Sequence, residues 1–191
     1  MNNITFTSRY RFVGNGEFAR STLSYSKQQF VDFPWTLSEA VLSNKAYTKD
    51  VEDCTVLGLT DGLKVLLLHL TPSLSQNRKS NKIIDYIKDK IDVKNPYLQG
   101  FIMGSKPNMI NSQYSEKVYE FLEKFLIDNK IPFTKMKGSN CAHSVAYNSN
   151  TDEWIISCEN FSNKNQMTED KFLKSNFNTI EFCEEDELIS D

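Results

Sequence analysis

Apolar residues recur along the chain with two spacings, one typical of helices and one typical of strands. Residues 115–129 follow i, i+3, i+4, i+7 and i+8 steps, and residues 78–91 carry a second such stripe, so both predict helices. The other apolar runs are short and favour strands; they cover residues 4–13, 98–103, 131–136, 142–147 and 153–158. Together these patterns predict an α/β (α+β) fold, a layered sandwich of a mixed, largely antiparallel sheet packed with helices.

A third, shorter helix is expected near residue 36. Thr36 is a suitable N-cap, because its hydroxyl can accept a hydrogen bond from a free backbone N–H of the first turn. Glu39 follows three residues later, where a carboxylate completes a capping box. We therefore predict that the segment after Thr36 is helical.

Residues 55–69 predict a β-hairpin. Two β-prone runs, 55–60 and 63–69, are joined by Asp61-Gly62, a dipeptide typical of a two-residue type I′ turn. With these two residues as the whole loop, the last residue of the first run pairs with the first residue of the second.

This register predicts that Cys54 lies directly opposite His69. Directly opposed residues project from one face, with Cβ atoms about 4.5–5.5 Å apart. An imidazole at that distance can take the proton of a thiol, as a nucleophilic cysteine requires. A β-bulge at Gly58 would shift the register by one residue and separate the pair. In the alternative interpretation both residues only pack, since free cysteines are commonly buried and inert.

Composition excludes several function classes. The 22 basic and 25 acidic residues give a net charge of -3, and the aromatic residues are not interleaved with a basic patch, so we expect no nucleic-acid partner. No apolar run approaches the roughly 18 residues of a membrane span, and residues 1–12 lack the apolar region of a secretory signal. We expect a monomer without a membrane partner.

The four cysteines and two histidines are the scarce reactive groups. The cysteines form no CxxC pair, which argues against a zinc finger and favours a reduced, cytosolic chain. Cys141 and His143 would share a face of one strand, and with Cys158 they could bind zinc or form a second cysteine–histidine pair. Structural zinc sites need four ligands with closer pairings, so we predict no metal and no cofactor. The simpler interpretation makes His143 a partly exposed strand residue, and Cys183 a residue of the tail.

Thr48, Cys54 and His69 have the spacing found in a known family. The pattern resembles the chemoreceptor glutamine deamidase CheD and the toxin deamidases of the cytotoxic necrotizing factor type, which share its catalytic core. These families place a threonine six residues before a catalytic cysteine and a histidine on the following strand. The order of predicted elements is also similar over residues 46–158, including a small-residue segment that ends at Gly104-Ser105.

The chain departs from that family on both sides of the predicted site. Glu52-Asp53 stand directly before Cys54, where CheD has Gly-Ser. Two carboxylates beside a thiol disfavour its thiolate form unless they point away. The arginine that follows the Gly-Gly turn of CheD is absent, and Cys141 and His143 lie nearby instead.

The resemblance implies a glutamine deamidase that acts on a protein substrate through a thioester. Cys54 would attack the glutamine carboxamide, His69 would take the thiol proton and deliver it to the departing ammonia, and Thr48 would orient the imidazole. Capture of the thioester by an amine would give transglutamination instead. The alternative is a non-catalytic protein-binding domain on the same scaffold, with Cys54 and His69 only structural.

Residues 1–161 are expected to form one domain, and residues 162–191 a polar, acidic C-terminal extension. Acidic ends are usually solvated. This one also resembles the glutamate-rich C-terminal signals of type IV secreted bacterial effectors. Combined with the likeness to toxin deamidases, it suggests an effector that leaves the bacterial cytoplasm and modifies a host protein in the host cytoplasm.

Overall fold

The computed structural model describes six stretches of the chain. They are residues 8–30, 38–73, 81–104, 112–137, 142–158 and 179–183. Within them the chain forms three helices and twelve strands, and the strands make two sheets. The helices are α1 (Asn15–Ser21), α2 (Asn81–Lys90) and α3 (Ser112–Asp128).

The two sheets differ in size, and both are mixed. The smaller sheet runs β1 (Arg9–Val13), β11 (Glu153–Cys158), β10 (His143–Asn148), β5 (Lys45–Val51), β2 (Ser26–Lys27). The larger runs β12 (Thr179–Cys183), β9 (Phe133–Lys137), β8 (Gln99–Gly104), β6 (Thr55–Thr60), β7 (Val65–Leu70), β4 (Glu39–Ser43), β3 (Gln29–Phe30). Pairs β1–β11, β2–β5 and β8–β9 are parallel, and the other neighbours are antiparallel. The predicted α+β sandwich is confirmed, with two sheets in place of one.

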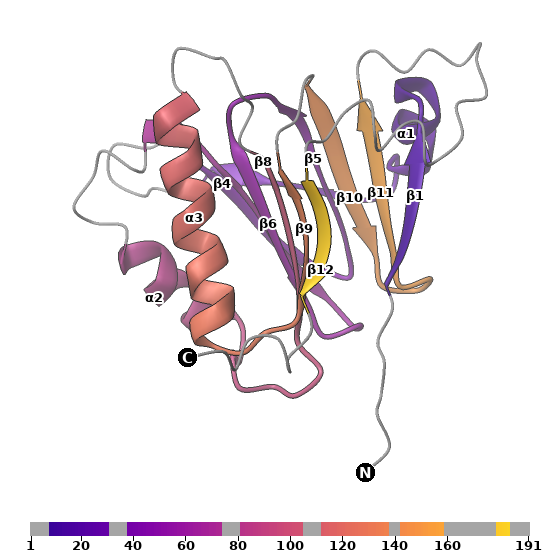
Figure 1. Cartoon of the computed structure of the whole chain (residues 1–191). Coiled ribbons are helices and arrows are strands. Elements are labelled where there is room, and N and C mark those ends of the chain that lie inside the picture. The colour runs from indigo at the N-terminus through magenta and orange to yellow at the C-terminus, as the bar shows by residue number, and fades with distance from the viewer. Residues whose placement is uncertain are drawn as a thin grey trace.

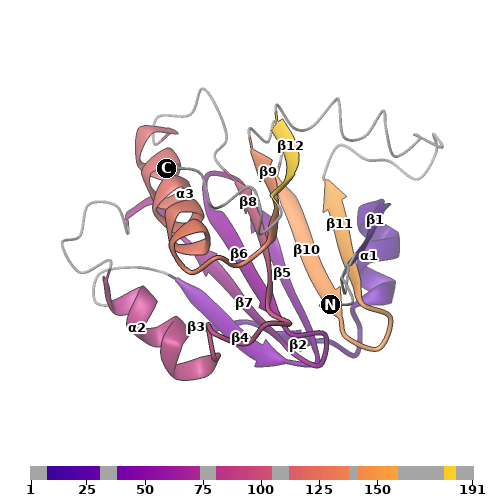
Figure 2. The ribbon, with the colours of Figure 1, turned by 60° about the horizontal axis from the view of Figure 1, so that its bottom comes forward.

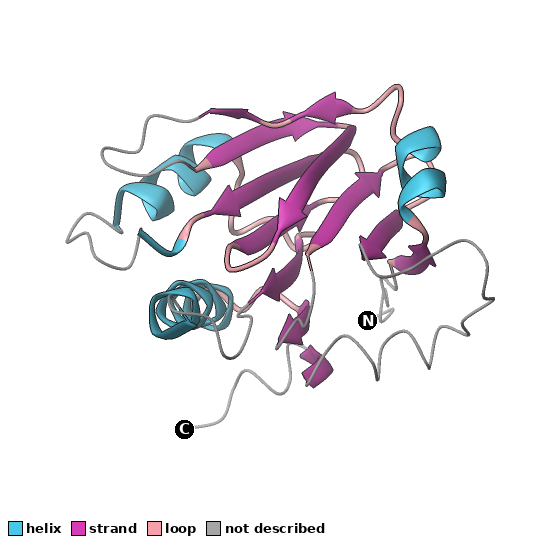
Figure 3. Ribbon diagram, turned by 90° about the horizontal axis from the view of Figure 1, so that it is seen from above, coloured by secondary structure: helices cyan, strands magenta, loops and turns pink. Residues whose placement is uncertain are grey.

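The elements are arranged in four layers. Helices α2 and α3 cover one face of the larger sheet, and α1 lies against the smaller sheet at the far side (Figures 1 and 2). Figure 3 shows the helices at opposite sides of the strands from above. One apolar core lies between the larger sheet and its helices, and a second lies between the sheets. Strands β6 and β7 are therefore buried on both faces, which explains their nearly continuous apolar sequences.

Trp154 sets the contact between the two sheets. It projects from β11, is 1% exposed, and stacks on Phe101 of β8 with ring centroids 4.6 Å apart. Tyr147 of β10 packs on it at 4.8 Å. The indole lies directly over Gly58 of β6, where an added Cβ would come within 2.1 Å of the ring. Only the lack of a side chain at Gly58 allows the indole to approach β6 this closely.

Strands β6 and β7 form the predicted hairpin, but its loop has four residues, 61–64. Asp61 Oδ1 accepts hydrogen bonds from the backbone N–H groups of Leu63 and Lys64, at 3.0 and 3.1 Å. Gly62 has a φ of +83°, whereas Asp61 does not have a positive φ. A type I′ turn needs a positive φ at both central residues, so the predicted two-residue turn is wrong.

The helix expected after Thr36 is also wrong. Residues 39–43 form β4, which pairs with β7, and Thr36 itself lies outside the described residues. Ala40 is buried toward the helices, whereas Val41 packs into the core between the sheets. This alternation is that of a strand.

The described residues bear on the predicted domain boundary as well. Residues 179–183 form β12, which pairs with β9, so part of the expected 162–191 extension belongs to the larger sheet. Residues 138–141, which connect the predicted strands 131–136 and 142–147, and the last eight residues lie outside the described parts. In the described residues no helix has the length and apolar character needed to cross a membrane.

Replacing Gly58 with alanine tests the contact with Trp154. Alanine is ordinarily the better strand residue because glycine loses more backbone entropy on folding. At Gly58, the Cβ must displace the indole, and we expect the free energy of unfolding to fall by about 1–3 kcal/mol. Urea unfolding followed by circular dichroism measures the change. In a Trp154→Phe background the smaller ring leaves room, and the loss shrinks; an equal loss in both backgrounds contradicts the explanation.

Candidate functional site

A hydrogen bond between Thr48 and His69 is one of those that join the two sheets. Thr48 Oγ1 of β5 and His69 Nδ1 of β7 are 2.8 Å apart. Thr48 is 3% exposed, and its strand packs toward the larger sheet. His69 is half-buried and continues the face of β7 that carries Val65 and Leu67 into the same core. The structure thus brings together two of the three site residues, although they belong to different sheets.

The contact determines what the imidazole can do. A neutral imidazole carries its proton on one nitrogen and accepts a hydrogen bond at the other. In the tautomer whose Nδ1–H donates to Thr48 Oγ1, Nε2 of His69 keeps its lone pair. That nitrogen is then a base fixed in position by Thr48.

A β-bulge follows Thr48 on β5. Val145 of β10 pairs with Thr48, and His143 pairs with Val51, so Lys49 and Asp50 together face a single residue of β10. Asp50 has a φ of +57°, a conformation that aspartate adopts more readily than most residues. The regular pairing of β5 therefore ends next to the residue that holds the imidazole.

Cys54 lies where the chain crosses from the smaller to the larger sheet, between β5 and β6. Val56 is the residue opposite His69, so the predicted direct pairing of Cys54 with His69 is wrong by two residues. The longer loop causes the shift, not a bulge at Gly58. A shift of two keeps Cys54 on the face of Val56, and it packs against the core between the sheets.

Cys54 and His69 are therefore diagonal neighbours. Such positions have Cα atoms about 7–8 Å apart, within reach of long side chains. Among the described residues, no hydrogen bond links the two; the Cys54 thiol donates to Asp53 Oδ1, with the sulfur and oxygen 3.7 Å apart. The thiol is half-buried. A proton transfer between them requires a rotation of the Cys54 side chain away from Asp53.

Burial and carboxylates oppose ionisation of the thiol. The pKa of Cys54 is raised from its ordinary value of 9.0 to about 12; burial is the largest cause, followed by Asp53, Glu52 and Glu39 in that order. The expectation that Glu52-Asp53 disfavour the thiolate is confirmed in direction. Desolvation, which the sequence did not reveal, is the larger cause.

Burial also keeps the imidazole neutral. It lowers the pKa of His69 below 6.5, while the carboxylates of Glu39, Asp50 and Asp53 act in the opposite direction. Glu39 is the residue of β4 paired with His69. Sequence reasoning missed this neighbour because it placed Glu39 in a helix; residues 40–42 are all apolar and offer no alternation that would have identified the strand. At neutral pH the site thus holds a neutral thiol beside a neutral base.

Gly104 packs closely against the backbone of Cys54 and Thr55. A Cβ at Gly104 would lie 2.7 Å from the Cys54 carbonyl oxygen and 3.0 Å from the Cα of Thr55. Its φ of +149° is also one that other residues rarely adopt. This glycine ends the small-residue segment noted in the sequence, so that segment lies beside the candidate nucleophile.

The second cysteine–histidine group is only partly described. His143 pairs with Cys158 across β10 and β11, and Cys141 lies outside the described residues. His143 is 1% exposed, so the expectation of a partly exposed residue is wrong. In the parts that the structure describes, no three histidine, cysteine or acidic side chains are grouped to hold a metal. Cys183 is a half-buried residue of β12.

Thr48→Val tests the hydrogen bond to His69. Removal of the hydroxyl leaves a largely buried imidazole nitrogen unpaired, so we expect a loss of about 1–3 kcal/mol in the free energy of unfolding. The ¹⁵N chemical shifts of the His69 ring also change, because nothing then fixes the tautomer. Urea unfolding and ring ¹⁵N spectra measure the two effects.

Thr55 provides a matched control for this variant. It is 0% exposed, and its hydroxyl has no hydrogen-bond partner among the described residues. Thr55→Val removes the same atom without breaking a bond and is expected to leave stability unchanged or higher, with His69 shifts as in the wild type. Equal effects of the two variants would refute a specific role for Thr48.

The reactivity of Cys54 tests its environment. Since the thiolate is the reactive form, iodoacetamide should label Cys54 slowly at pH 8, and the rate should still rise at pH 10 without a plateau. Asp53→Asn removes a nearby charge and leaves only a neutral amide oxygen, a weaker acceptor, for the thiol proton, so it should accelerate labelling more than Glu52→Gln. Peptide mass spectrometry distinguishes the four cysteines. A plateau near pH 9, as for an ordinary thiol, would contradict the raised pKa.

Comparison with known proteins identifies no family for this chain. A scan against protein-family models and a search of curated proteins return no match for this chain. The likeness to cysteine glutamine deamidases therefore depends on the spacing of Thr48, Cys54 and His69. In addition to this spacing, the fold shows a hydrogen bond between Thr48 and His69, with Cys54 packed against the core between the sheets on the same side as His69.

Proposed function

We propose that this protein is a cysteine-dependent amidohydrolase that deamidates glutamine in a protein substrate. Cys54 is the nucleophile, His69 the general base and acid, and Thr48 the positioning residue. The observation that carries the proposal is the 2.8 Å contact of Thr48 Oγ1 with His69 Nδ1. A threonine that reaches across two sheets to fix a half-buried imidazole beside a thiol fits a triad defined by its roles.

The first half of the reaction forms a thioester. His69 Nε2 takes the thiol proton as the Cys54 sulfur bonds to the carbonyl carbon of the glutamine side chain, which gives a tetrahedral intermediate. The imidazolium then donates that proton to the amide nitrogen. The carbon–nitrogen bond breaks, and ammonia leaves.

The second half restores the enzyme. Water loses a proton to His69 and attacks the thioester carbon, the carbon–sulfur bond breaks, and the Cys54 sulfur recovers the proton. The products are a glutamate side chain and the free thiol. If a primary amine replaces water, the same steps give a substituted glutamine, which is transglutamination.

The charges at the site determine how the nucleophile is activated. A preformed thiolate–imidazolium pair is disfavoured, because the pKa of Cys54 is raised to about 12 and that of His69 is lowered. Proton transfer must therefore accompany attack, as in serine hydrolases, where the nucleophile is also neutral before the reaction. Because the pKa of His69 is lowered, the base stays largely unprotonated to a lower pH than an ordinary imidazole does.

A second candidate function is a non-catalytic protein-binding domain. The raised pKa of Cys54, and its hydrogen bond to Asp53 in place of His69, favour this alternative. In that case the thiol and the imidazole only pack at the edge of the core between the sheets. For either function we propose a monomeric bacterial effector that acts on a host protein in the host cytoplasm, as the toxin-like spacing and the acidic end suggest.

The decisive experiment incubates the protein with a eukaryotic cytosolic extract in ¹⁸O-labelled water. Hydrolysis of a thioester places one solvent oxygen in the new glutamate, so peptide mass spectrometry identifies both the target and the position. We expect glutamine-to-glutamate conversion with wild-type protein and none with Cys54→Ser or His69→Ala. Thr48→Val should reduce the rate at least tenfold through loss of the oriented base.

Two control variants separate chemistry from folding. Cys183→Ser removes another half-buried thiol, and Thr55→Val removes another buried hydroxyl; both should retain full activity. Conversion that survives in Cys54→Ser, or its absence with folded wild-type protein, would refute the deamidase. A stable complex with an unmodified host protein would instead support the binding domain.

A further inference from the structure

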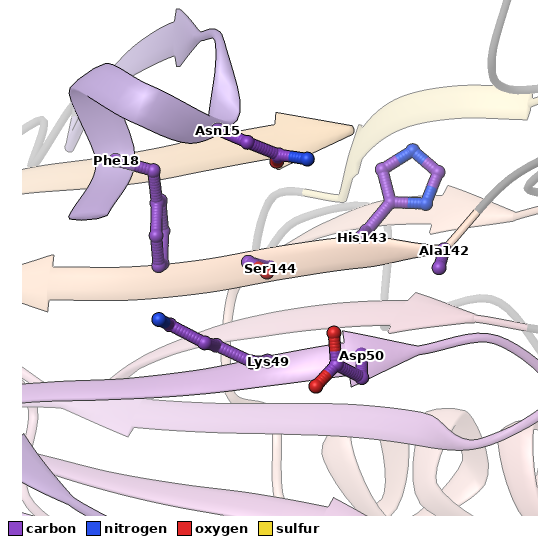
Figure 4. A pocket seen from close by; sticks show the side chains of 7 residues that line it. All are labelled: Asn15, Phe18, Lys49, Asp50, Ala142, His143 and Ser144. Carbon is purple, nitrogen blue, oxygen red and sulfur yellow. The ribbon is translucent and has the colours of Figure 1, made fainter. Parts of the chain in front are cut away.

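A pocket of about 200 Å³ lies beside α1, at the bulge of β5 (Figure 4). Its polar lining comes from Asn15, Lys49, Asp50, His143 and Ser144, and the ring of Phe18 forms an apolar wall. Pockets for drug-sized ligands usually exceed 300 Å³, whereas a cavity of about 150 Å³ holds benzene. The pocket is thus sized for a molecule somewhat larger than benzene.

The pocket presents one positive and one negative charge. Lys49 and Asp50 are adjacent on the bulge, and Figure 4 shows their charged groups separated along β5. Neither takes part in any of the ion pairs of the described residues. Lys49 only lies over the Tyr47 ring, with Nζ 5.7 Å from its centroid. Both charges are therefore available to a ligand of opposite polarity.

The amide of Asn15 is oriented toward the same space. Ser157, which is 0% exposed, donates a hydrogen bond to Asn15 Oδ1, so the amide nitrogen is the end left to donate. In Figure 4 that nitrogen points toward the side of the pocket where His143 lies. The imidazole of His143 is itself 1% exposed and fixed at the start of β10. Amide N–H groups of this kind bind carboxylates.

We propose that this pocket binds a small zwitterion of the class of free α-amino acids. The carboxylate of the ligand lies against Lys49 and its ammonium group lies against Asp50, while the Asn15 amide nitrogen adds a donor on the side of His143. A ligand with only one charge would leave one of these two groups unpaired. The proposal does not depend on the proposed deamidase, although Asp50 also acts on the pKa of His69.

Titration monitored by ¹H–¹⁵N spectra tests the proposal on the full chain. The probes are glycine, glutamine and glutamate, with acetate and methylammonium as single-charge controls. We expect saturable shifts at Asn15 and Ser144 with at least one amino acid, and binding at least tenfold weaker for both single-charge probes. Tenfold is the minimum expected for loss of one charge-assisted hydrogen bond.

Matched variants locate the binding. Lys49→Met and Asp50→Asn should each weaken it at least tenfold, and asparagine tolerates the positive φ at position 50. Lys45→Met removes another lysine of β5, one whose Nζ lies over the Tyr25 ring, and should leave binding unchanged, as should Glu52→Gln. Absence of saturable shifts, equal binding of the single-charge probes, or undiminished binding by the Lys49 and Asp50 variants would each overturn the proposal.

Discussion

The contact between Trp154 and Gly58 is the constraint on which the candidate site depends. Because β6 carries no side chain at that point, the indole fills the space between the sheets and determines their separation. That separation places Thr48, on one sheet, within 2.8 Å of His69 on the other. Packed interiors transmit strain because they contain few voids. A change under the indole would therefore alter the geometry of the imidazole as well as the stability of the fold.

The environment of Cys54 makes the ground state inert. Burial and three nearby carboxylates favour the protonated thiol, while burial also favours the uncharged imidazole. Charge separation between the two would develop in a half-buried, low-dielectric position surrounded by negative groups, which stabilise the imidazolium and destabilise the thiolate. A nucleophile in such a setting is protected from indiscriminate alkylation and oxidation, since both proceed through the thiolate.

Local patterns predicted the elements better than their partners. The α3 helix and β11 follow directly from apolar spacing. The prediction that Cys54 and His69 share a face is right although the register is wrong by two residues, because a shift of two preserves side-chain direction. The loop length was not predictable from Asp61-Gly62 alone, since the Asp61 side chain caps a longer turn. The bulge at Asp50 and the position of Glu39 depend on strands that are distant in sequence, and a capping pattern misassigned Glu39. Thr48 was predicted as a site residue only from the spacing found in the deamidase families. In the fold its hydroxyl is hydrogen-bonded to the His69 imidazole.

The parallel pairing of β1 with β11 constrains the order in which the two sheets fold during synthesis. It joins residues 9–13 to residues 153–157, so the smaller sheet cannot close until most of the chain has been synthesised. Pairings of such long range are entropically costly to form and make folding slow. His69 belongs to the β6–β7 hairpin of the larger sheet and Cys54 directly precedes it, whereas β5, with Thr48, pairs with the distant β10. The nascent chain therefore assembles its thiol and imidazole early and acquires the residue that orients them late.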